Sequence, residues 1–213
     1  MSMKLYTYFR SSAAYRVRIA LNLKGLDVEM APIHLLRKGG EQLGEAYRRI
    51  NPQCTVPALR TEEGVVLTDN AAITTYLEAF KPDPPLLGIT PLEKAEVASW
   101  NWRAEFEGLL AIAEALRNGS PAMANRALPG PRDYPQIPEL AQRGVARVHE
   151  FFGTLEARLQ GRAFVATERF SVADITAAVA VDFARVVKVK PGEAHPNLLR
   201  WRAALAERPS LAL

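Results

Sequence analysis

The sequence has little of what several common kinds of chemistry require. Cys54 is the only cysteine among 213 residues, so an intrachain disulfide and a zinc-cysteine site are both excluded. No apolar run approaches the roughly 20 residues that a membrane-spanning helix needs, and the N-terminus lacks the layout of a signal peptide. The net charge is only +4 and the basic residues are scattered, which makes nucleic acid a poor candidate partner. These absences predict a cytoplasmic protein that needs no metal and binds no membrane.

Familiar catalytic motifs are also missing. The three histidines are isolated, and His149 lacks the second histidine of a zinc protease motif. The chain contains neither a Gly-x-Ser-x-Gly elbow nor a glycine-rich nucleotide loop. The residues at the beginnings of helices are therefore the main candidates for a functional site.

The first 80 residues alternate short apolar strands with helices. The expected elements, in chain order, are strands at 5–9 and 28–33 with a helix between them that stops at Gly25, a short helix at 41–50, strands at 57–60 and 65–67 around a turn at 62–64, and a helix at 71–80. The order β-α-β-α-β-β-α predicts a thioredoxin-like domain over residues 1–80.

The rest of the chain shows no strand pattern. A proline-rich linker covers 81–90, and residues 91–213 predict an all-α helical bundle. The expected helices run from 91 to 117, from 139 to 159, from 171 onward and from 197 to 207, with a long loop at 118–138. Capping boxes at Thr90–Glu93 and Ser171–Asp174 mark two helix starts. The apolar stretch after Ser171 predicts a buried central helix.

Ser11 and Ser12 stand where the first strand runs into the first helix. Unpaired N–H groups and the helix dipole favour an anion at such a position. The Cys-x-x-Cys of dithiol oxidoreductases is absent, since these slots hold Ser11 and Ala14. A serine hydroxyl here could donate to the thiolate of a bound peptide. The alternative is that either serine merely caps the helix.

Two further segments suit an extended peptide ligand. A cis bond between Val56 and Pro57 would leave the N–H and C=O of Val56 open for strand-like pairing, the alternative being an ordinary turn. Asp69 and Asn70 precede the helix at 71–80, where they could receive an ammonium and a carboxylate. Capping by Asn70 is the simpler role there, and the two roles are compatible.

Several separated motifs together resemble those of soluble glutathione transferases. Residues 11–21 are similar to the zeta-class signature Ser-Ser-Cys-x-Trp-Arg-Val-Arg-Ile-Ala-Leu, and 51–59 and 67–77 also match. The capping box from Ser171 to Asp174 is similar to one in the family's second half. The first half most resembles the zeta class, the class of maleylacetoacetate isomerases. The resemblance implies the glutathione transferase fold, glutathione as substrate or cofactor, and a homodimer.

The resemblance also implies roles for individual residues. Ser11 falls on the serine that activates the thiol, with Ser12 beside it, and Gln42 falls on a glutamine that contacts the glycine end of glutathione. Thr55 and Val56 precede the cis-proline Pro57, and the backbone of Val56 would pair with the peptide. Asp69 and Asn70 fall on the pair that holds the γ-glutamyl end. Asn70 departs from the usual serine. We expect the wall of the electrophile site to include Tyr15, Arg103, Phe106 and Leu110.

Some departures from the zeta pattern keep the reaction open. Ala13 replaces the zeta cysteine, Tyr15 replaces the tryptophan, and Arg185 lies one position away from the arginine that holds substrate carboxylates in that class. The first hypothesis is a transferase in which a Ser11-stabilised thiolate attacks a small electrophile. The alternatives are a glutathione-dependent cis-trans isomerase of a maleyl-type acid and a non-catalytic interaction module.

Overall fold

The structure is a computed structural model that describes residues 2–208, so that residue 1 and residues 209–213, at the outer ends of the two predicted domains, lie outside it. The chain forms two compact units. The first ends at Pro84 and also includes Pro129–Arg132, and the second consists of Pro85–Leu128 and the chain from Asp133 onward. Among the described helices, none combines the length and the apolar character needed to cross a membrane.

A four-stranded sheet forms the centre of the first unit. Its strands are β1 (Lys4–Thr7), β2 (Glu29–Pro32), β3 (Ala58–Arg60) and β4 (Val66–Leu67), in the spatial order β2-β1-β3-β4. The pairing of β1 with β2 is parallel, and the other pairs are antiparallel. Leu5 of the inner strand β1 is fully buried opposite Met30 and Leu59. A parallel pair needs a crossover, and the first helix supplies it.

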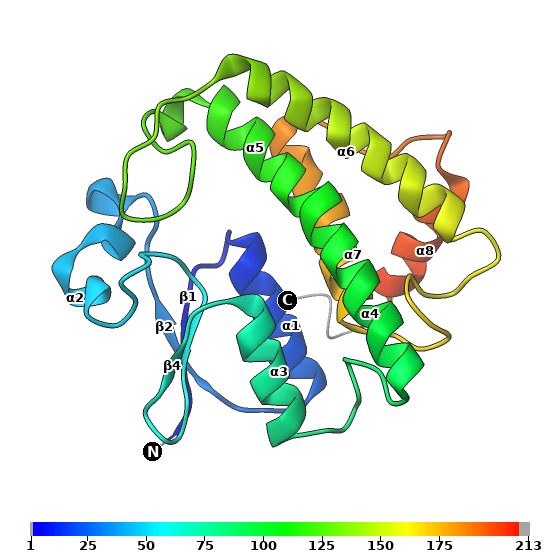
Figure 1. Cartoon of the computed structure of the whole chain (residues 1–213), viewed down its shortest axis with the longest axis horizontal. Coiled ribbons are helices and arrows are strands. Elements are labelled where there is room, and N and C mark those ends of the chain that lie inside the picture. The colour runs from blue at the N-terminus through cyan, green and yellow to red at the C-terminus, as the bar shows by residue number, and fades with distance from the viewer. Residues whose placement is uncertain (1, 209–213) are drawn as a thin grey trace. The chain divides into compact units, whose positions relative to one another are not determined.

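The helical elements of this unit are α1 (Ser12–Leu23), the 3-10 turns η1 (Arg37–Gly39) and η2 (Glu41–Leu43), α2 (Glu45–Arg48) and α3 (Asn70–Phe80). Figure 1 shows α1 and α3 side by side on one side of the sheet, with α2 on the other side. Val17 and Leu21 of α1 and Ile73 and Leu77 of α3 are buried. The predicted order β-α-β-α-β-β-α is confirmed.

The structure corrects three details of this half. The helix expected at 41–50 is broken into η2 and α2, because the backbone of Gly44 between them is extended. The first strand ends at Thr7, two residues before the expected end. Ile73, Leu77 and Phe80 share a helical spacing in the sequence that predicts one face of α3, but Phe80 is exposed and stacks on Tyr76, so it does not belong to the core face.

A buried lysine holds the last residues of the first unit, from Glu78 to Pro84, by an ion pair and hydrogen bonds. Lys24, just after α1, is almost fully buried, and its Nζ lies 2.7 Å from Glu78 Oε2. The same ammonium donates to the carbonyls of Lys81 and Pro84. A buried charge is tolerated only when such partners satisfy it.

The regular elements of the second unit are all helical among its described residues. Its elements are α4 (Pro91–Arg103), the π-helical segment η3 (Ala104–Leu109), α5 (Leu110–Gly119), η4 (Pro121–Met123), α6 (Pro138–Arg158), α7 (Val172–Phe183), η5 (Ala184–Val187) and α8 (Pro196–Ala206). In Figure 1, α4 and α5 form one long rod, and α6 runs alongside α5. The helix expected at 91–117 therefore exists, but it contains a π turn that its sequence did not indicate.

The two predicted capping boxes are present at the starts of α4 and α7. Thr90 Oγ1 accepts from the Glu93 N–H at 3.1 Å, and the Glu93 carboxylate accepts from the Thr90 N–H at 3.2 Å. The helix α7 is buried on nearly every side, as its all-round apolar sequence predicted.

Candidate functional site

The N-terminus of α1 offers several hydrogen-bond donors. Ser11 is the N-cap, and its Oγ accepts from the N–H of Ala14 at 3.2 Å. This bond uses the oxygen and leaves the hydroxyl proton free to be donated. Within residues 2–208, the N–H groups of Ser12 and Ala13 have no hydrogen-bond partner, nor does the Ser12 hydroxyl. Capping by Ser11 and donation to an anion are therefore compatible, and the helix dipole adds to the second.

The start of α3 lies next to the start of α1. Asn70 Nδ2 donates to the carbonyl of Ala13 at 3.1 Å, which ties the two helices together. The cap of α3 is Asp69, whose carboxylate accepts from the Ala72 N–H at 2.8 Å. The expectation that Asn70 caps this helix is thus wrong by one residue, because Asp69 has the extended backbone that a cap requires and Asn70 is already helical.

The segment before Pro57 presents an open backbone. The Val56–Pro57 bond is cis, as predicted. Within the described chain, the N–H and C=O of Val56 form no hydrogen bond, so both are available to an extended ligand. The preceding residue is held firmly, since the Thr55 carbonyl accepts from Tyr47 Oη at 2.7 Å and from Asn51 Nδ2 at 2.8 Å.

The Tyr47 hydroxyl acts as a permanent donor in this arrangement. Burial raises the pKa of Tyr47 to about 12, so the phenol keeps its proton at any physiological pH. Sequence reasoning missed both Tyr47 and Asn51. The one signal available was that Asn51 begins the 51–59 motif.

Gln42 is buried with half of its amide unpaired. Its side chain is 9% exposed, and Nε2 makes a long contact of 3.4 Å with the carbonyl of Leu35. Oε1 has no partner among the described residues. Gly40 lies so close that a Cβ there would be 2.6 Å from Nε2, so only glycine allows this packing. A buried acceptor without a donor is costly, and a ligand N–H would satisfy it.

One hydrophobic cluster connects these segments. Ala14 of α1, Tyr47 of α2 and Val56 are buried in it, and Leu35, the residue that accepts from Gln42, packs against it. The structure therefore gathers within the first unit the residues predicted to bind glutathione, namely Ser11, Ser12, Gln42, Thr55, Val56, Pro57, Asp69 and Asn70. Their individual roles stay predictions.

The predicted wall residues fall on both units. Tyr15 lies on α1, where the guanidinium carbon of Arg18 is 5.3 Å from its ring centroid. Arg103 forms an ion pair with Glu107 and lies over the ring of Trp100, so its charge is already engaged. Phe106 and Leu110 are 48% and 44% exposed.

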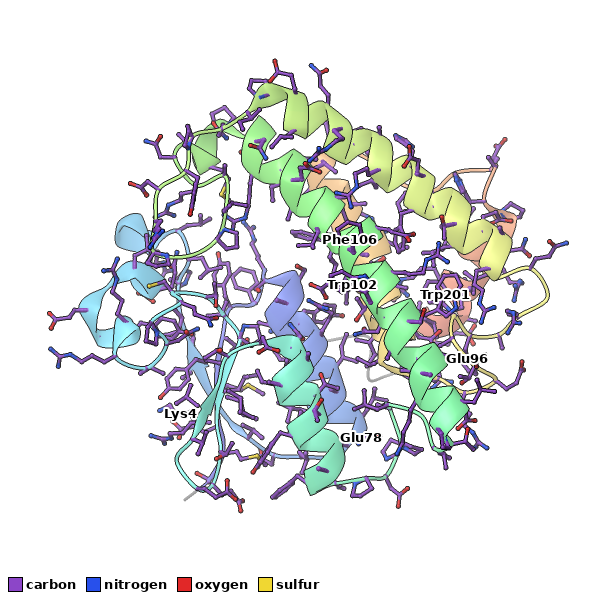
Figure 2. The ribbon with its side chains drawn as sticks, viewed as in Figure 1. Lys4, Glu78, Glu96, Trp102, Phe106 and Trp201 are labelled. Atoms are coloured by element: carbon purple, nitrogen blue, oxygen red, sulfur yellow. The ribbon has the colours of Figure 1, made fainter. Side chains whose placement is uncertain are left out.

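Sequence reasoning left Trp102 out of this set. Of the two nearby tryptophans, Trp100 packs against the core, and Trp102 is 60% exposed and stacks on Phe106. Both Trp102 and Phe106 are labelled in Figure 2 on the rod formed by α4 and η3. The four-residue spacing from Trp102 to Phe106 to Leu110 was the available signal.

Across residues 2–208, no group of three or more His, Cys, Asp or Glu side chains is arranged to hold a metal ion. The site instead combines two helix N-termini, an open stretch of backbone and one buried amide oxygen. Such a set can bind an anionic peptide in extended form and stabilise an anion at the start of α1.

Comparison with known families identifies two matching domains. The family described as "Glutathione S-transferase, N-terminal domain" matches residues 10–79, and "Glutathione S-transferase, C-terminal domain" matches residues 120–209. A curated relative, glutathione S-transferase 2 of Saccharomyces cerevisiae, is 33% identical over 99% of this chain and 89% of its own length.

A second curated relative matches only part of the chain, and a solved structure matches nearly all of it. Maleylacetoacetate isomerase of Pseudomonas aeruginosa is 54% identical over 93 residues, and the match covers 44% of each chain, so this chain spans less than half the length of that relative. A solved glutathione S-transferase domain-containing protein from Marinobacter aquaeolei has a TM-score of 0.88 and 32% identity, covering 98% of this chain and 99% of the other.

Proposed function

We propose that this chain, which belongs to the glutathione S-transferase family, binds glutathione in its first unit and joins it through its sulfur to a small electrophile. The observation that carries the proposal is the Ser11 hydroxyl, which accepts from Ala14 and keeps its own proton for a sulfur anion. Next to it are the unpaired N–H groups of Ser12 and Ala13. No other base is required, because stabilising the thiolate lowers the pKa of the thiol directly.

The proposed reaction is a nucleophilic attack by the thiolate. A new carbon–sulfur bond forms at the electrophilic carbon, and a leaving group such as chloride departs with the bonding electron pair. At an activated double bond the adjacent carbon takes up a proton instead. The proposed role of the second unit is to supply most of the wall of the electrophile site. The predicted wall residues are Arg103, Phe106 and Leu110 from the second unit and Tyr15 from the first. Assembly as a homodimer in the cytoplasm likewise remains a prediction.

A second candidate is the glutathione-dependent isomerisation of a maleyl-type acid. It is favoured by the 54% identity to maleylacetoacetate isomerase over 93 residues. Conjugation is preferred because the glutathione S-transferase 2 match extends over 99% of the chain, and because Ala13 stands where the zeta signature has cysteine. In isomerisation, glutathione would add to the double bond and leave again unchanged.

Two assays on the purified chain separate these functions. We expect retention on glutathione resin, and consumption of glutathione with 1-chloro-2,4-dinitrobenzene. Isomerisation of maleylacetone without net loss of glutathione, together with no conjugation, would favour the isomerase. A chain that the resin does not retain at all would contradict both enzymatic readings and favour an interaction module.

Gln42 provides a test of glutathione binding alone. Because Oε1 is a buried acceptor without a donor, we expect a backbone N–H of glutathione to pair with it. Gln42→Ala should raise the KM for glutathione about five- to tenfold, with little change in kcat, since the bond is made equally in the ground and transition states. The control is Gln53→Ala, which removes an exposed glutamine of the same unit. An unchanged KM in Gln42→Ala would remove this residue from the binding site.

A further inference from the structure

The segment η3 interrupts the long helical rod with a different winding. The N–H of Leu110 donates to the carbonyl of Glu105, five residues back, as in a π-helix. Such segments are rare and occur frequently at functional sites. The helix α6 packs closely against it, since a Cβ on Gly108 would lie 2.7 Å from the ring of Phe151. The π turn is therefore a packed feature of the second unit.

Arg147 of α6 makes two contacts with Phe106 and a third with Glu114. Its Nη2 donates to the Phe106 carbonyl at 2.6 Å, and its guanidinium carbon lies 4.9 Å from the centroid of the Phe106 ring. Its Nη1 donates to Glu114 Oε2 at 3.0 Å, which fixes the guanidinium from the other end. The side chains of Arg147 and Glu114 are only 24% and 12% exposed. One cation thus holds both the backbone and the ring of Phe106.

The ring that Arg147 holds is part of an exposed aromatic pair. Trp102 and Phe106 stack with centroids 5.5 Å apart and an angle of 15° between their planes. They expose 60% and 48% of their surfaces (Figure 2). Leu110, four residues after Phe106, is 44% exposed. Partly exposed aromatic rings favour flat aromatic partners through offset or edge-to-face contacts. A ring held in one orientation loses little entropy when it binds such a partner.

We propose that Arg147 is a positioning residue that presets Phe106, and through it Trp102, as a surface that selects planar aromatic electrophiles. This inference rests on the proposed transferase function and adds to it a residue that positions the wall of the electrophile site. Arg147 acts through Phe106 and does not itself take part in the chemical step. The guanidinium is suited to this task because it is planar and can donate in two directions while stacking on a ring, which an ammonium cannot do.

The test compares two electrophiles at saturating glutathione in the full chain. For 1-chloro-2,4-dinitrobenzene, we expect Arg147→Met to raise KM about fivefold or more, with kcat changed by less than about twofold, because the loss affects binding of the aromatic ring. For the aliphatic allyl isothiocyanate, both constants should stay within about twofold of the unmodified chain, since it cannot stack.

Arg143→Met is the matched control. Arg143 is also on α6 and pairs with the same carboxylate of Glu114, but its side chain is 61% exposed. Among the described residues, the hydrogen bond and the cation–π contact with Phe106 come from Arg147 and not from Arg143. We expect this variant to behave like the unmodified chain with both electrophiles. Arg147→Lys keeps a positive charge that can pair with Glu114 but lacks the planar guanidinium. It should therefore show most of the rise in KM expected for Arg147→Met, and it replaces that variant in the test if Arg147→Met folds poorly.

Two results would overturn the inference. One is an equal loss with the aromatic and the aliphatic electrophile, which would make Arg147 a general structural residue. The other is an Arg147→Met variant that behaves like Arg143→Met while the unmodified chain conjugates both compounds. Failure of the unmodified chain to conjugate either compound is a different result, because it would overturn the proposed function together with this inference.

Discussion

Turnover is expected to fall about 100-fold or more in Ser11→Ala, as it does when one oriented donor to a reacting anion is lost. Affinity for glutathione should change far less, because the rest of the peptide is held elsewhere in the first unit. The measurement is kcat and KM for glutathione with 1-chloro-2,4-dinitrobenzene. A titration of the thiolate absorbance of bound glutathione should show its pKa rising toward the reference value of about 8.5.

The energies of the donors at α1 are sufficient for this effect. Lowering the pKa of a thiol by about two units requires roughly 2.7 kcal/mol of preferential interaction with the anion. A hydrogen bond to a charged group contributes about 1.5–3 kcal/mol, and a helix N-terminus adds about 0.3–1 kcal/mol. Removing the Ser11 hydroxyl therefore removes most of the stabilisation, and the dipole alone cannot replace it.

Further variants separate catalysis from capping. Ser11 accepts from the Ala14 N–H, so Ser11→Ala also removes a helix cap, which costs about 1 kcal/mol of stability. Ser11→Gly keeps a residue that caps almost as well but has no hydroxyl, and Ser11→Thr restores the hydroxyl. The glycine variant should be as slow as the alanine variant, and the threonine variant should recover activity. If Ser12→Ala were the slow variant and Ser11→Gly were not, the sulfur would belong beside Ser12.

Asp174→Ala is expected to have the largest effect on stability. The Asp174 carboxylate is fully buried at the start of α7 and accepts from the N–H groups of Val165 and Ser171 at 2.8 and 3.0 Å. It also accepts from the Ser171 hydroxyl and from Nε1 of the buried Trp201. Alanine would leave these donors buried without an acceptor, and each such group costs about 1–3 kcal/mol. The expected loss of about 3–5 kcal/mol would take up much of a typical free energy of unfolding.

The thermal midpoint of the full chain measures this loss. We expect it to fall by about 10 °C or more in Asp174→Ala. Asp182→Ala is the matched control, because Asp182 lies on the same helix but is partly exposed in its pairing with Arg202. Such a partly exposed pair contributes about 1 kcal/mol or less, so the control should change the midpoint little. Similar midpoints for the two variants would contradict the role given to Asp174.

The pH dependence of the same residue follows from its burial. Burial raises the pKa of Asp174 from 3.8 to about 6, despite the groups that donate to it. The folded chain therefore holds this proton up to about pH 6, whereas the unfolded chain releases it near 3.8. The proton on Asp174 therefore contributes to the free energy of unfolding in full below pH 3.8, and this contribution is lost as the pH rises through 6. Relative to Asp174→Asn, the unmodified chain should gain stability from pH 7 to pH 4. A constant difference would contradict the shift.

Local signals in the sequence were enough to define much of the fold. The capping boxes at Thr90 and Ser171 predicted where α4 and α7 begin, and the apolar stretch after Ser171 predicted that α7 is buried. The turn between β3 and β4 was read from Gly64, which has φ +86°. These predictions succeeded because caps, turns and helical periodicity depend on residues a few positions apart.

The candidate site was predicted only in part. Ser11 and Val56 could be identified because a serine before a helix and a residue before proline carry meaning in the sequence itself. The placement of Asn70 against Ala13, 57 residues away, could not be read from any local pattern. Nor could the unpaired oxygen of Gln42, which results from how the chain around Gly40 folds back on it.

By itself the sequence determined the two kinds of fold, the order of their elements and the serine pair at the start of α1. Tertiary structure alone decided that η3 winds as a π-helix, that Trp102 is exposed while Trp100 is packed, and that Arg147 reaches Phe106 across 41 residues of chain. The physical reason is that capping and periodicity are short-range effects. Which side chain stays exposed, and which cation meets which carbonyl, depends on the packing of helices distant in sequence.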